Sequence, residues 1–401
     1  MIEIPIPKRQ ADHKNVVGLT VEPIPTVRIE IVGMGERGLK ALRRLASIPG
    51  AEVVAVRDND PNHQAKAEQL LKELQASRKV PSSFLPPPSS IDLTYICTDW
   101  QSHTPLAIDA MRKGRHVAVE VPAAITLNDI WQLIDTAEET RRHCMMLENC
   151  VYDYFEMATA AMAQAGLFGE IIHVEGGYGH PIGEKWTHWR LDINKKTRGD
   201  IYPTHGMGPA CMLLKKACAD RLQSLVSMDT ASFLGPRILQ KYGNITDNDF
   251  RNGDQTTTII RTQQGRTITL NHNVMSPRPY TRFYQIIGTQ GFVQKDPVPF
   301  IIYTTPDGAE HRVQGDDCEE IISKYLPKDI LEWREEGARL DSRGGMAYHM
   351  DRRMIEHLRR GEPMDMDVYD MADWCAVIPL SELSIEKGFQ PVSFPDFRRI
   401  S

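Results

Sequence analysis

Residues 27–58 read VRIEIVGMGERGLKALRRLASIPGAEVVAVRD, and this stretch decides the fold. It opens with an alternating β-branched run at 27–32, passes through a glycine turn into a helical pattern of leucines, and ends in a second strand-like run at 51–56. A strand, a glycine turn, a helix and a strand within about 30 residues are typical of a βαβ unit. We therefore predict that a parallel sheet begins here.

The three glycines of the turn have separate physical tasks. Gly33 permits the tight turn, Gly35 lets backbone N–H groups approach a pyrophosphate, and Gly38 allows close packing of helix on strand. The N-terminus of the following helix offers partial positive charge to the phosphates. Asp58, 20 residues beyond Gly38, suits the ribose hydroxyls of NAD and would repel the 2′-phosphate of NADP, a preference that the adjacent Arg57 weakens. We predict NAD binding; a glycine turn without a ligand is the less favoured alternative.

Outward from this unit, strands and helices continue to alternate up to residue 150. Strand-like runs at 93–97, 116–119 and 144–147 are separated by helical patterns and short turns. Strictly alternating βα units favour a parallel sheet that is covered on both faces. We expect a doubly wound Rossmann domain of the α/β class over residues 27–150.

The rhythm changes after residue 150. Strand-like runs now follow one another, with turn signals between several of them and amphipathic helices at 344–361 and 368–388. The runs lie at 171–177, 255–262, 267–273, 282–288 and 298–304. We predict an α+β domain over 151–401 with an open, mainly antiparallel sheet. The first 26 residues are polar and rich in proline, and we expect an N-terminal arm.

Composition narrows the class of protein. The chain has 401 residues, 41% hydrophobic and 25% charged, as in an ordinary globular protein of two domains. A net charge of −6 argues against a nucleic-acid partner, and no apolar run approaches the ~18 residues of a membrane span. Seven cysteines without a C-x-x-C pair indicate reduced thiols. With no apolar leader segment visible, we expect a cytoplasmic protein, unless an export signal has been removed from a longer chain.

Two tyrosine–histidine pairs are the candidate chemical groups of the second domain. Tyr178 and His180 directly follow a strand-like run, and Tyr202 and His205 lie at a proline- and glycine-containing junction before a helical run. Any one tyrosine or histidine is more often structural than functional. The two pairs together with Arg190 favour a polar active site.

Metal and serine chemistry are the rival explanations. The histidines at 180, 188 and 205 have neither H-x-x-x-H spacing nor paired cysteines, so we expect no catalytic metal. A serine hydrolase is unsupported because the chain has no G-x-S-x-G elbow.

Six stretches carry a resemblance to known proteins. They are VEVPAA at 119–124, MMLENC at 145–150, RGDIYPTHGMGPAC at 198–211, SLVSMDT at 224–230, HNVMSPRPY at 272–280 and MDMDVYD at 364–370. With these stretches the N-terminal half resembles the Gfo/Idh/MocA oxidoreductases. The whole chain from about residue 27 is similar to glycoside hydrolase family 109, the NAD-dependent α-N-acetylgalactosaminidases of that superfamily.

The resemblance implies two sets of site residues. The NAD contacts would be, besides the glycine turn, Glu36, Arg37, Asp58, the segment from Trp100 to His103, Glu120, Val121 and Asn149. The substrate site would hold Tyr178, His180, Arg190, Tyr202, His205 and Tyr280. Within this second set we expect Tyr178, His180 and His205 to be catalytic, with His205 and Tyr178 as the proton-transfer pair.

Departures from the patterns are informative. Dehydrogenases of the superfamily usually have Glu-Lys-Pro where this chain has Glu120-Val121-Pro122, so their catalytic lysine is missing, and Ile201 stands where they often have an aspartate. Compared with family 109, the loop at 81–90 and the stretch between His180 and Arg190 look shortened, which leaves the exact sugar open.

The resemblance also implies a reaction. NAD would stay bound and take a hydride from C3 of the sugar, a base would remove the acidified C2 proton, the C1 group would leave, water would add, and the hydride would return. The usual pair of flanking carboxylates is then unnecessary. A net sugar oxidoreductase and a non-catalytic sugar sensor that contains NAD remain alternatives. The expected partner is a small glycoside, and we expect a homo-oligomer.

Overall fold

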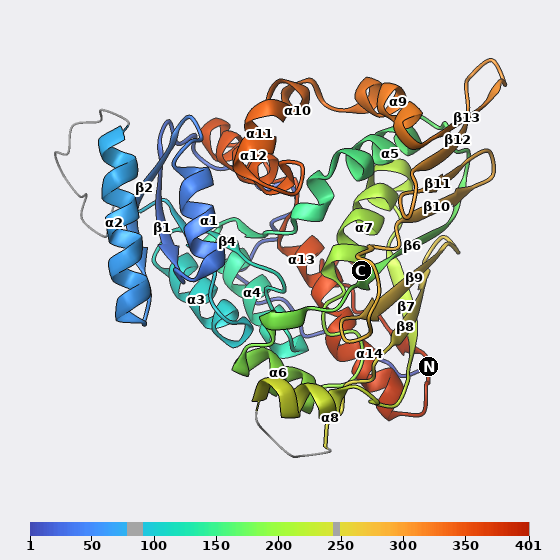
Figure 1. Ribbon diagram of the computed structural model, residues 1–401, viewed down its shortest axis with the longest axis horizontal. Coiled ribbons are helices and arrows are strands. Elements are labelled where there is room, and N and C mark those ends of the chain that lie inside the picture. Colours follow the sequence, from blue (N-terminus) through green and yellow to red (C-terminus); the bar gives the residue numbers. More distant parts are fainter. Residues whose placement is uncertain (78–90, 244–248, 401) are drawn as a thin grey trace. The chain divides into compact units, whose positions relative to one another are not determined.

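The computed structural model describes residues 1–77, 91–243 and 249–400 and divides into two compact units (Figure 1). The first unit comprises Pro7–Tyr152, Glu332–Ala372 and Phe397–Ser401. The second comprises Met1–Ile6, Asp153–Leu331 and Asp373–Asp396. The domain boundaries expected at residues 26 and 150 stay predictions, and the loop at 81–90 lies outside the described residues.

The first unit is built on a five-stranded parallel sheet in the order β2-β1-β3-β4-β5. Its strands are β1 (Val27–Val32), β2 (Ala51–Arg57), β3 (Leu93–Ile96), β4 (His116–Val119) and β5 (Cys144–Met146). Every residue of β3, β4 and β5 is buried, as expected where helices cover both faces of a parallel sheet. The predicted doubly wound architecture is confirmed.

Two helices of this unit, α3 and α4, begin at residues whose side chains cap them. The helices of the unit are α1 (Glu36–Leu45), α2 (Pro61–Ser77), α3 (Trp100–Arg112), α4 (Leu127–Thr140), α11 (Arg334–Leu340) and α12 (Met346–Arg360), with the 3-10 helix η2 at Asn149–Tyr152. Helix α3 starts at Trp100, because the Asp99 carboxylate accepts the Ser102 backbone N–H at 3.1 Å. Thr126 caps α4 in the same way through the Asp129 N–H.

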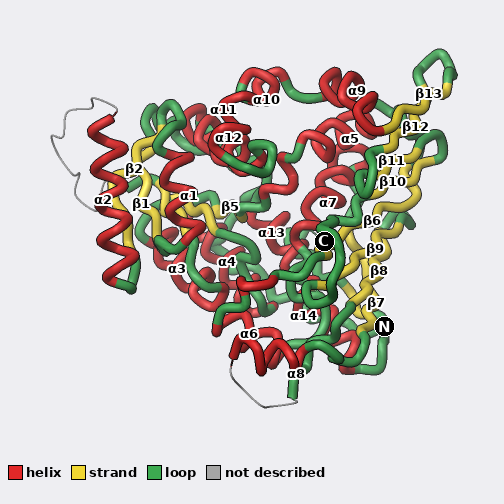
Figure 2. Tube along the Cα trace, in the orientation of Figure 1, coloured by secondary structure: helices red, strands yellow, loops and turns green. Residues whose placement is uncertain are grey.

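The second unit contains a nine-stranded sheet in the order β13-β12-β11-β10-β6-β9-β8-β7-β14, seen edge-on as a yellow layer in Figure 2. Among the described strands of this sheet, β6 and β9 are the one parallel pair, so the predicted open, mainly antiparallel sheet is confirmed. The strands are β6 (Ile171–Gly179), β7 (Leu222–Asp229), β8 (Thr256–Thr262), β9 (Thr267–Asn273), β10 (Gln285–Gly288), β11 (Phe292–Gln294), β12 (Phe300–Thr304), β13 (Glu310–Gln314) and β14 (Val392–Ser393).

Two predictions for this part of the chain were wrong in detail. The strand predicted from residue 282 begins at Gln285, because Phe283 has a φ of +56°, which interrupts extended backbone. The single helix predicted over 368–388 is two, α13 (Val368–Cys375) and α14 (Val377–Glu386). Pro379 has no N–H for the carbonyl of Cys375, so the helical hydrogen-bond ladder breaks between them.

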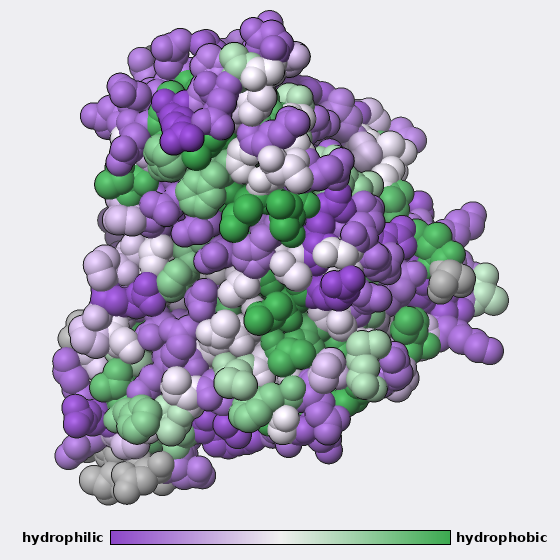
Figure 3. All heavy atoms as spheres, turned by 90° about the vertical axis from the view of Figure 1, so that its right-hand side faces the viewer, coloured by the Kyte–Doolittle hydropathy of each residue, from purple (hydrophilic) through white to green (hydrophobic). Residues whose placement is uncertain are grey.

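Helices cover one face of the nine-stranded sheet. They include α5 (Tyr154–Gln164), α7 (Thr204–Cys218) and α14, with α6 (His188–Lys196), α8 (Gly235–Ile238), α9 (Cys318–Tyr325) and α10 (Lys328–Glu332) on the connections. Helix α7 lies against β6 through glycines: a Cβ on Gly206 would lie 2.3 Å from the backbone nitrogen of Gly177. On the other face Ile172, Met228 and Ile259 are each about half exposed, and Figure 3 shows such hydrophobic groups among hydrophilic ones.

The N-terminal segment is bonded along its length. Ile2 forms a parallel bridge with Val392 in the second unit. In the first unit Val16 and Leu19 are buried, and the Val21 N–H donates to the Gly361 carbonyl. The described residues contain no helix that is long and apolar enough to cross a membrane.

Candidate active site

The glycine turn fits a dinucleotide phosphate. Gly33 has a φ of +88°, and a Cβ there would lie 2.7 Å from the backbone of Cys97. A Cβ on Gly38 would lie 2.0 Å from the carbonyl oxygen of Gly33, so both glycines are required by local packing. A Cβ on Gly35, in contrast, would meet no atom within 4 Å. The middle glycine therefore borders open space directly before the N-terminus of α1, where a pyrophosphate can approach.

Asp58 ties the second strand to this turn. One of its carboxylate oxygens accepts the Met34 N–H at 2.5 Å, and the other accepts the Asp60 N–H at 2.8 Å. Each oxygen keeps a lone pair for a ribose hydroxyl. The neighbouring Arg57 lies 3.9 Å from the Glu30 carboxylate, so its charge is partly engaged there.

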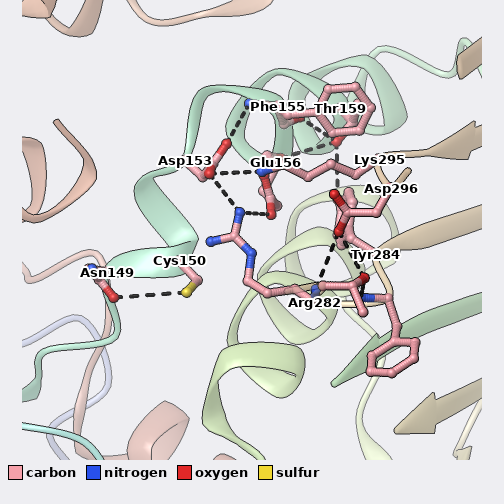
Figure 4. A network of polar contacts seen from close by, with 12 residues as sticks. Asn149, Cys150, Asp153, Phe155, Glu156, Thr159, Arg282, Tyr284, Lys295 and Asp296 are labelled. Carbon is pink, nitrogen blue, oxygen red and sulfur yellow. Dashed lines mark hydrogen bonds and ion pairs between the residues drawn. The ribbon is translucent and has the colours of Figure 1, made fainter. Parts of the chain in front are cut away.

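The remaining predicted NAD contacts come from the ends of β3 and β4 and from the segment after β5. Arg37 in the turn lies 4.0 Å from Glu120 at the end of β4, and Val121 beside it is buried. Trp100 opens α3 and is largely buried. Asn149 is buried in η2, with its side-chain oxygen 3.8 Å from the Cys150 sulfur (Figure 4). Glu36 binds Lys40 on the exposed side of α1.

His103 lies deeper than the other predicted NAD contacts. It is fully buried, and its ring nitrogens lie 2.8 Å from the Pro122 carbonyl oxygen and 3.1 Å from that of Thr98. Burial lowers the pKa of the imidazole, which favours the neutral ring. His103 thus joins the turns that follow β3 and β4, and direct contact with NAD stays a prediction.

In the second unit the predicted tyrosines and histidines converge on one ring. The Tyr178 ring centroid lies 4.8 Å from that of His180, 4.9 Å from Tyr202, 5.1 Å from His205 and 6.3 Å from Tyr280. The Tyr178 hydroxyl lies 2.7 Å from Nε2 of His180. We call these five side chains the aromatic cluster.

Three chain segments supply the aromatic cluster. Tyr178 is the penultimate residue of strand β6, and α7 begins at Thr204. His205 in its first turn is 1% exposed, and its ring lies 4.9 Å from that of Tyr202. The glycine contact between α7 and β6 lets these two segments meet. Tyr280, on the third segment, is 47% exposed, and its ring centroid lies 5.2 Å from that of His180.

A buried charge network supports the third segment and was not predicted from the sequence (Figure 4). The Arg282 guanidinium lies 2.6 Å from the carboxylates of Asp153 and Glu156, and the Lys295 ammonium lies 2.8 Å and 2.7 Å from the same two groups. Burial raises the pKa of Glu156 to about 7, whereas the two cations outweigh burial at Asp153 and hold its pKa well below the usual range. Next to Arg282, the backbone of Thr281 pairs with Gly179 through two hydrogen bonds.

Arg190 lies on α6. Its guanidinium stacks 4.4 Å above the Trp189 ring and donates to the Lys185 carbonyl at 2.9 Å. Its expected role in substrate binding stays a prediction.

A group of side chains of metal-ligand types occurs in the first unit. Ligand atoms of His13, Asp135 and Glu138 lie within 4.8 Å of one another. Arg399 binds Asp135 at 2.5 Å and Arg9 binds Glu138 at 2.9 Å, so both carboxylate charges are already compensated. A cation would have to compete with two arginines.

Family models match both parts of the chain. Residues 27–148 match the family described as "Oxidoreductase family, NAD-binding Rossmann fold". The protein is therefore an NAD-binding Rossmann protein of the Gfo/Idh/MocA class. Residues 183–401, more than half of the chain, match "Glycosyl hydrolase 109, C-terminal domain". The chain belongs to glycosyl hydrolase family 109.

Individual relatives agree. "Glycosyl hydrolase family 109 protein 1" of Phocaeicola vulgatus is 44% identical over 99% of this chain and 89% of its own length. A family 109 protein of Porphyromonas gingivalis is 44% identical over 99% of this chain and 90% of its own. The family resemblance and NAD binding predicted from the sequence are thereby confirmed.

Solved structures share the fold at low identity. Myo-inositol 2-dehydrogenase from Lactobacillus plantarum superposes with a TM-score of 0.66 at 17% identity, covering 92% of this chain and 100% of that one. An Agrobacterium radiobacter oxidoreductase in complex with NAD⁺, L-tartaric acid and magnesium superposes with a TM-score of 0.64 at 16% identity, covering 92% and 98%.

Proposed function

We propose that this NAD-dependent family 109 enzyme hydrolyses N-acetylgalactosaminides, most readily α-linked ones, by transient oxidation at C3, elimination and addition of water. The family and the Rossmann fold establish an NAD-dependent glycosidase or oxidoreductase. The observation that carries the finer proposal is the short contact between Tyr178 and His180 at the centre of the aromatic cluster. It gives Tyr178 an acceptor for its phenol proton, so the proposed site can move a proton without two opposed carboxylates.

The hydrogen bonds of His180 indicate how Tyr178 is activated. His180 Nδ1 lies 3.0 Å from the Pro181 carbonyl oxygen, which only accepts, so the ring proton is assigned to Nδ1. Nε2 then carries a lone pair and accepts the hydroxyl proton of Tyr178 at 2.7 Å. In the proposal Tyr178 removes the C2 proton of the sugar while His180 takes up the phenol proton.

His205 is the proposed second member of the proton-transfer pair. Its buried ring lies 5.1 Å from the Tyr178 ring, on a helix start that is packed against β6. Bound NAD supplies a reversible oxidant for the sugar, and the turn at Gly33–Gly38, Asp58, Glu120 and Asn149 are the residues proposed to hold it. Arg190, Tyr202 and Tyr280 are proposed to bind the sugar.

Hydrolysis in D₂O tests the elimination. The product N-acetylgalactosamine is expected to carry deuterium at C2, because the abstracted proton exchanges with solvent before protonation. A product without deuterium would refute the elimination route.

Aryl N-acetylgalactosaminides, N-acetylglucosaminides and galactosides, in both α and β forms, are assayed without added NAD. The rates identify the preferred sugar and anomer.

A net sugar oxidoreductase is the second candidate, favoured by the fold shared with myo-inositol 2-dehydrogenase. It predicts NADH accumulation at 340 nm with substrate and exchangeable cofactor, whereas the glycosidase predicts neither. A sugar sensor predicts saturable binding without turnover.

Light scattering after size exclusion tests the expected homo-oligomer, and cell fractionation tests the expected cytoplasmic location.

A further inference from the structure

Asp200 is a buried acid in the segment that carries two members of the aromatic cluster. Its side chain is 1% exposed and lies between α6 and α7, two residues before Tyr202. One carboxyl oxygen accepts the Tyr202 N–H at 3.2 Å. Among the described residues, the carboxyl group makes this one hydrogen bond. The Asp200 backbone N–H donates to the Ser381 hydroxyl at 3.0 Å.

The backbone before Asp200 is fixed from three sides. Arg198 forms two 2.8 Å hydrogen bonds with the Asp229 carboxylate. Gly199 has a φ of +93°, its carbonyl accepts the Asn252 side-chain amide at 3.1 Å, and a Cβ there would lie 2.5 Å from the Ser381 hydroxyl. Through its hydrogen bond to the Tyr202 N–H, the Asp200 carboxyl connects the Tyr202 backbone to this anchored stretch.

The charged groups around the segment are engaged with one another. Arg198 is directed to Asp229, and the Glu382 carboxylate on α14 accepts the Arg198 N–H at 3.0 Å. Arg251 lies 3.8 Å from Glu382 and 2.5 Å from Glu386. The titratable groups that follow on the segment itself are the Tyr202 phenol and the His205 imidazole.

Among the residues that the structure describes, no cation compensates an ionised Asp200. Burial raises the pKa of its carboxyl to about 7, and the Tyr202 amide opposes this shift only in part. A carboxylate so enclosed has to draw in water or a cation, which requires the segment to open.

We propose that Asp200 is a positioning residue of the aromatic cluster, whose neutral carboxyl holds Tyr202 and the His205 turn in place and whose ionisation loosens them. The proposal rests on the proposed function of the cluster in glycoside hydrolysis. It adds a built-in alkaline limit to the activity that originates outside the reacting groups.

Asp200→Asn is the decisive variant, because asparagine keeps the shape and the acceptor oxygen but does not ionise. At pH 6 we expect kcat/KM of the variant to equal that of the wild type. At pH 8 we expect the variant to be up to ~10-fold more active, since a group with a pKa near 7 is then only about one-tenth neutral. Asp307→Asn, an exposed aspartate in the turn between β12 and β13, is the matched control and is expected to follow the wild type throughout.

Two kinetic results would overturn the proposal. One is superimposable pH profiles of wild type and Asp200→Asn. The other is a constant ratio between them at every pH, which would make Asp200 merely structural.

Hydrogen exchange separates this proposal from the proposed function. Exchange of residues 198–206, measured by mass spectrometry and corrected for intrinsic rates, is expected to speed up between pH 6 and pH 8 in the wild type but not in Asp200→Asn. If the wild type hydrolyses no N-acetylgalactosaminide yet shows this difference, the proposed function fails and the positioning role stands. Equal exchange in both proteins overturns the positioning role.

Discussion

The hydroxyl of Tyr178 lies 2.7 Å from Nε2 of His180, while Nδ1 of the same ring lies 3.0 Å from the Pro181 carbonyl oxygen. The backbone thereby sets the tautomer of the histidine, and the histidine sets the direction of the tyrosine proton. In the proposed mechanism His180 accepts the Tyr178 proton, and the two residues lie at one end of strand β6.

Tyr178→Phe is expected to lower kcat by about 10²–10⁴-fold, because a positioned proton carrier contributes that much and phenylalanine keeps the ring packing. The melting temperature should stay near that of the wild type. Tyr303→Phe, on β12 beside His311, is the matched control and should retain activity. Undiminished turnover in Tyr178→Phe would remove Tyr178 from the chemistry.

His180→Gln should leave the phenol in place without its acceptor imidazole. We expect a smaller loss of kcat than in Tyr178→Phe and an optimum at higher pH, since the phenol must then ionise without help. A pH–rate profile with saturating substrate measures the shift. An unchanged optimum together with reduced kcat would show that His180 acts on packing alone.

Gly35→Ala and Gly38→Ala separate cofactor binding from folding. A methyl group on Gly35 enters open space, so we expect normal stability but at least ~10-fold weaker NAD binding. A methyl group on Gly38 meets the Gly33 carbonyl, and we expect a loss of about 1–3 kcal/mol in the free energy of unfolding. Bound NAD and urea unfolding are the two measurements. Full NAD affinity in Gly35→Ala would contradict the assigned phosphate position.

Arg282→Met should destabilise the second unit by about 3–5 kcal/mol, because two buried carboxylates then share only Lys295. The KM for glycosides should also rise, since Arg282 anchors the segment that carries Tyr280. Arg312→Met on exposed β13 is the control. Equal melting temperatures for both variants would mean that the network contributes little to stability.

Acid should destabilise the first unit through His116 and His143. Burial lowers their pKa values to about 3 and about 4, so between the unfolded value near 6.5 and these values the unfolded chain binds more protons than the folded one. Stability is therefore present above pH 6.5 and lost as the pH falls. His116→Asn keeps an acceptor for the His143 N–H and should flatten the fall in melting temperature between pH 6.5 and 4.5, whereas His311→Asn should not. Parallel melting curves for all three proteins would contradict this origin of acid sensitivity.

Local patterns predicted much of the fold and the cluster. The alternation in β1 and the glycine turn are visible in the sequence because their periodicity and spacing follow directly from strand and turn geometry. Tyr178 and His205 were identifiable because they stand where a strand ends and a helix begins.

Other features depend on contacts between residues distant in the chain. Asp153, Glu156, Arg282 and Lys295 form one network, yet nothing in their spacing joins the first pair to the second. The proposed role of Asp200 rests on its burial with no compensating cation among the described residues, which no motif reveals. Sequence periodicity reports which face of an element is apolar, but not which distant side chains will meet there.

The contact of Gly206 with Gly176 and Gly177 has a consequence for redesign. There is no room for even one methyl group between the two backbones. The distance between the backbone positions of Tyr178 and His205 is therefore fixed. Attempts to change the accepted sugar should therefore leave this glycine contact unchanged and vary the half-exposed Tyr280.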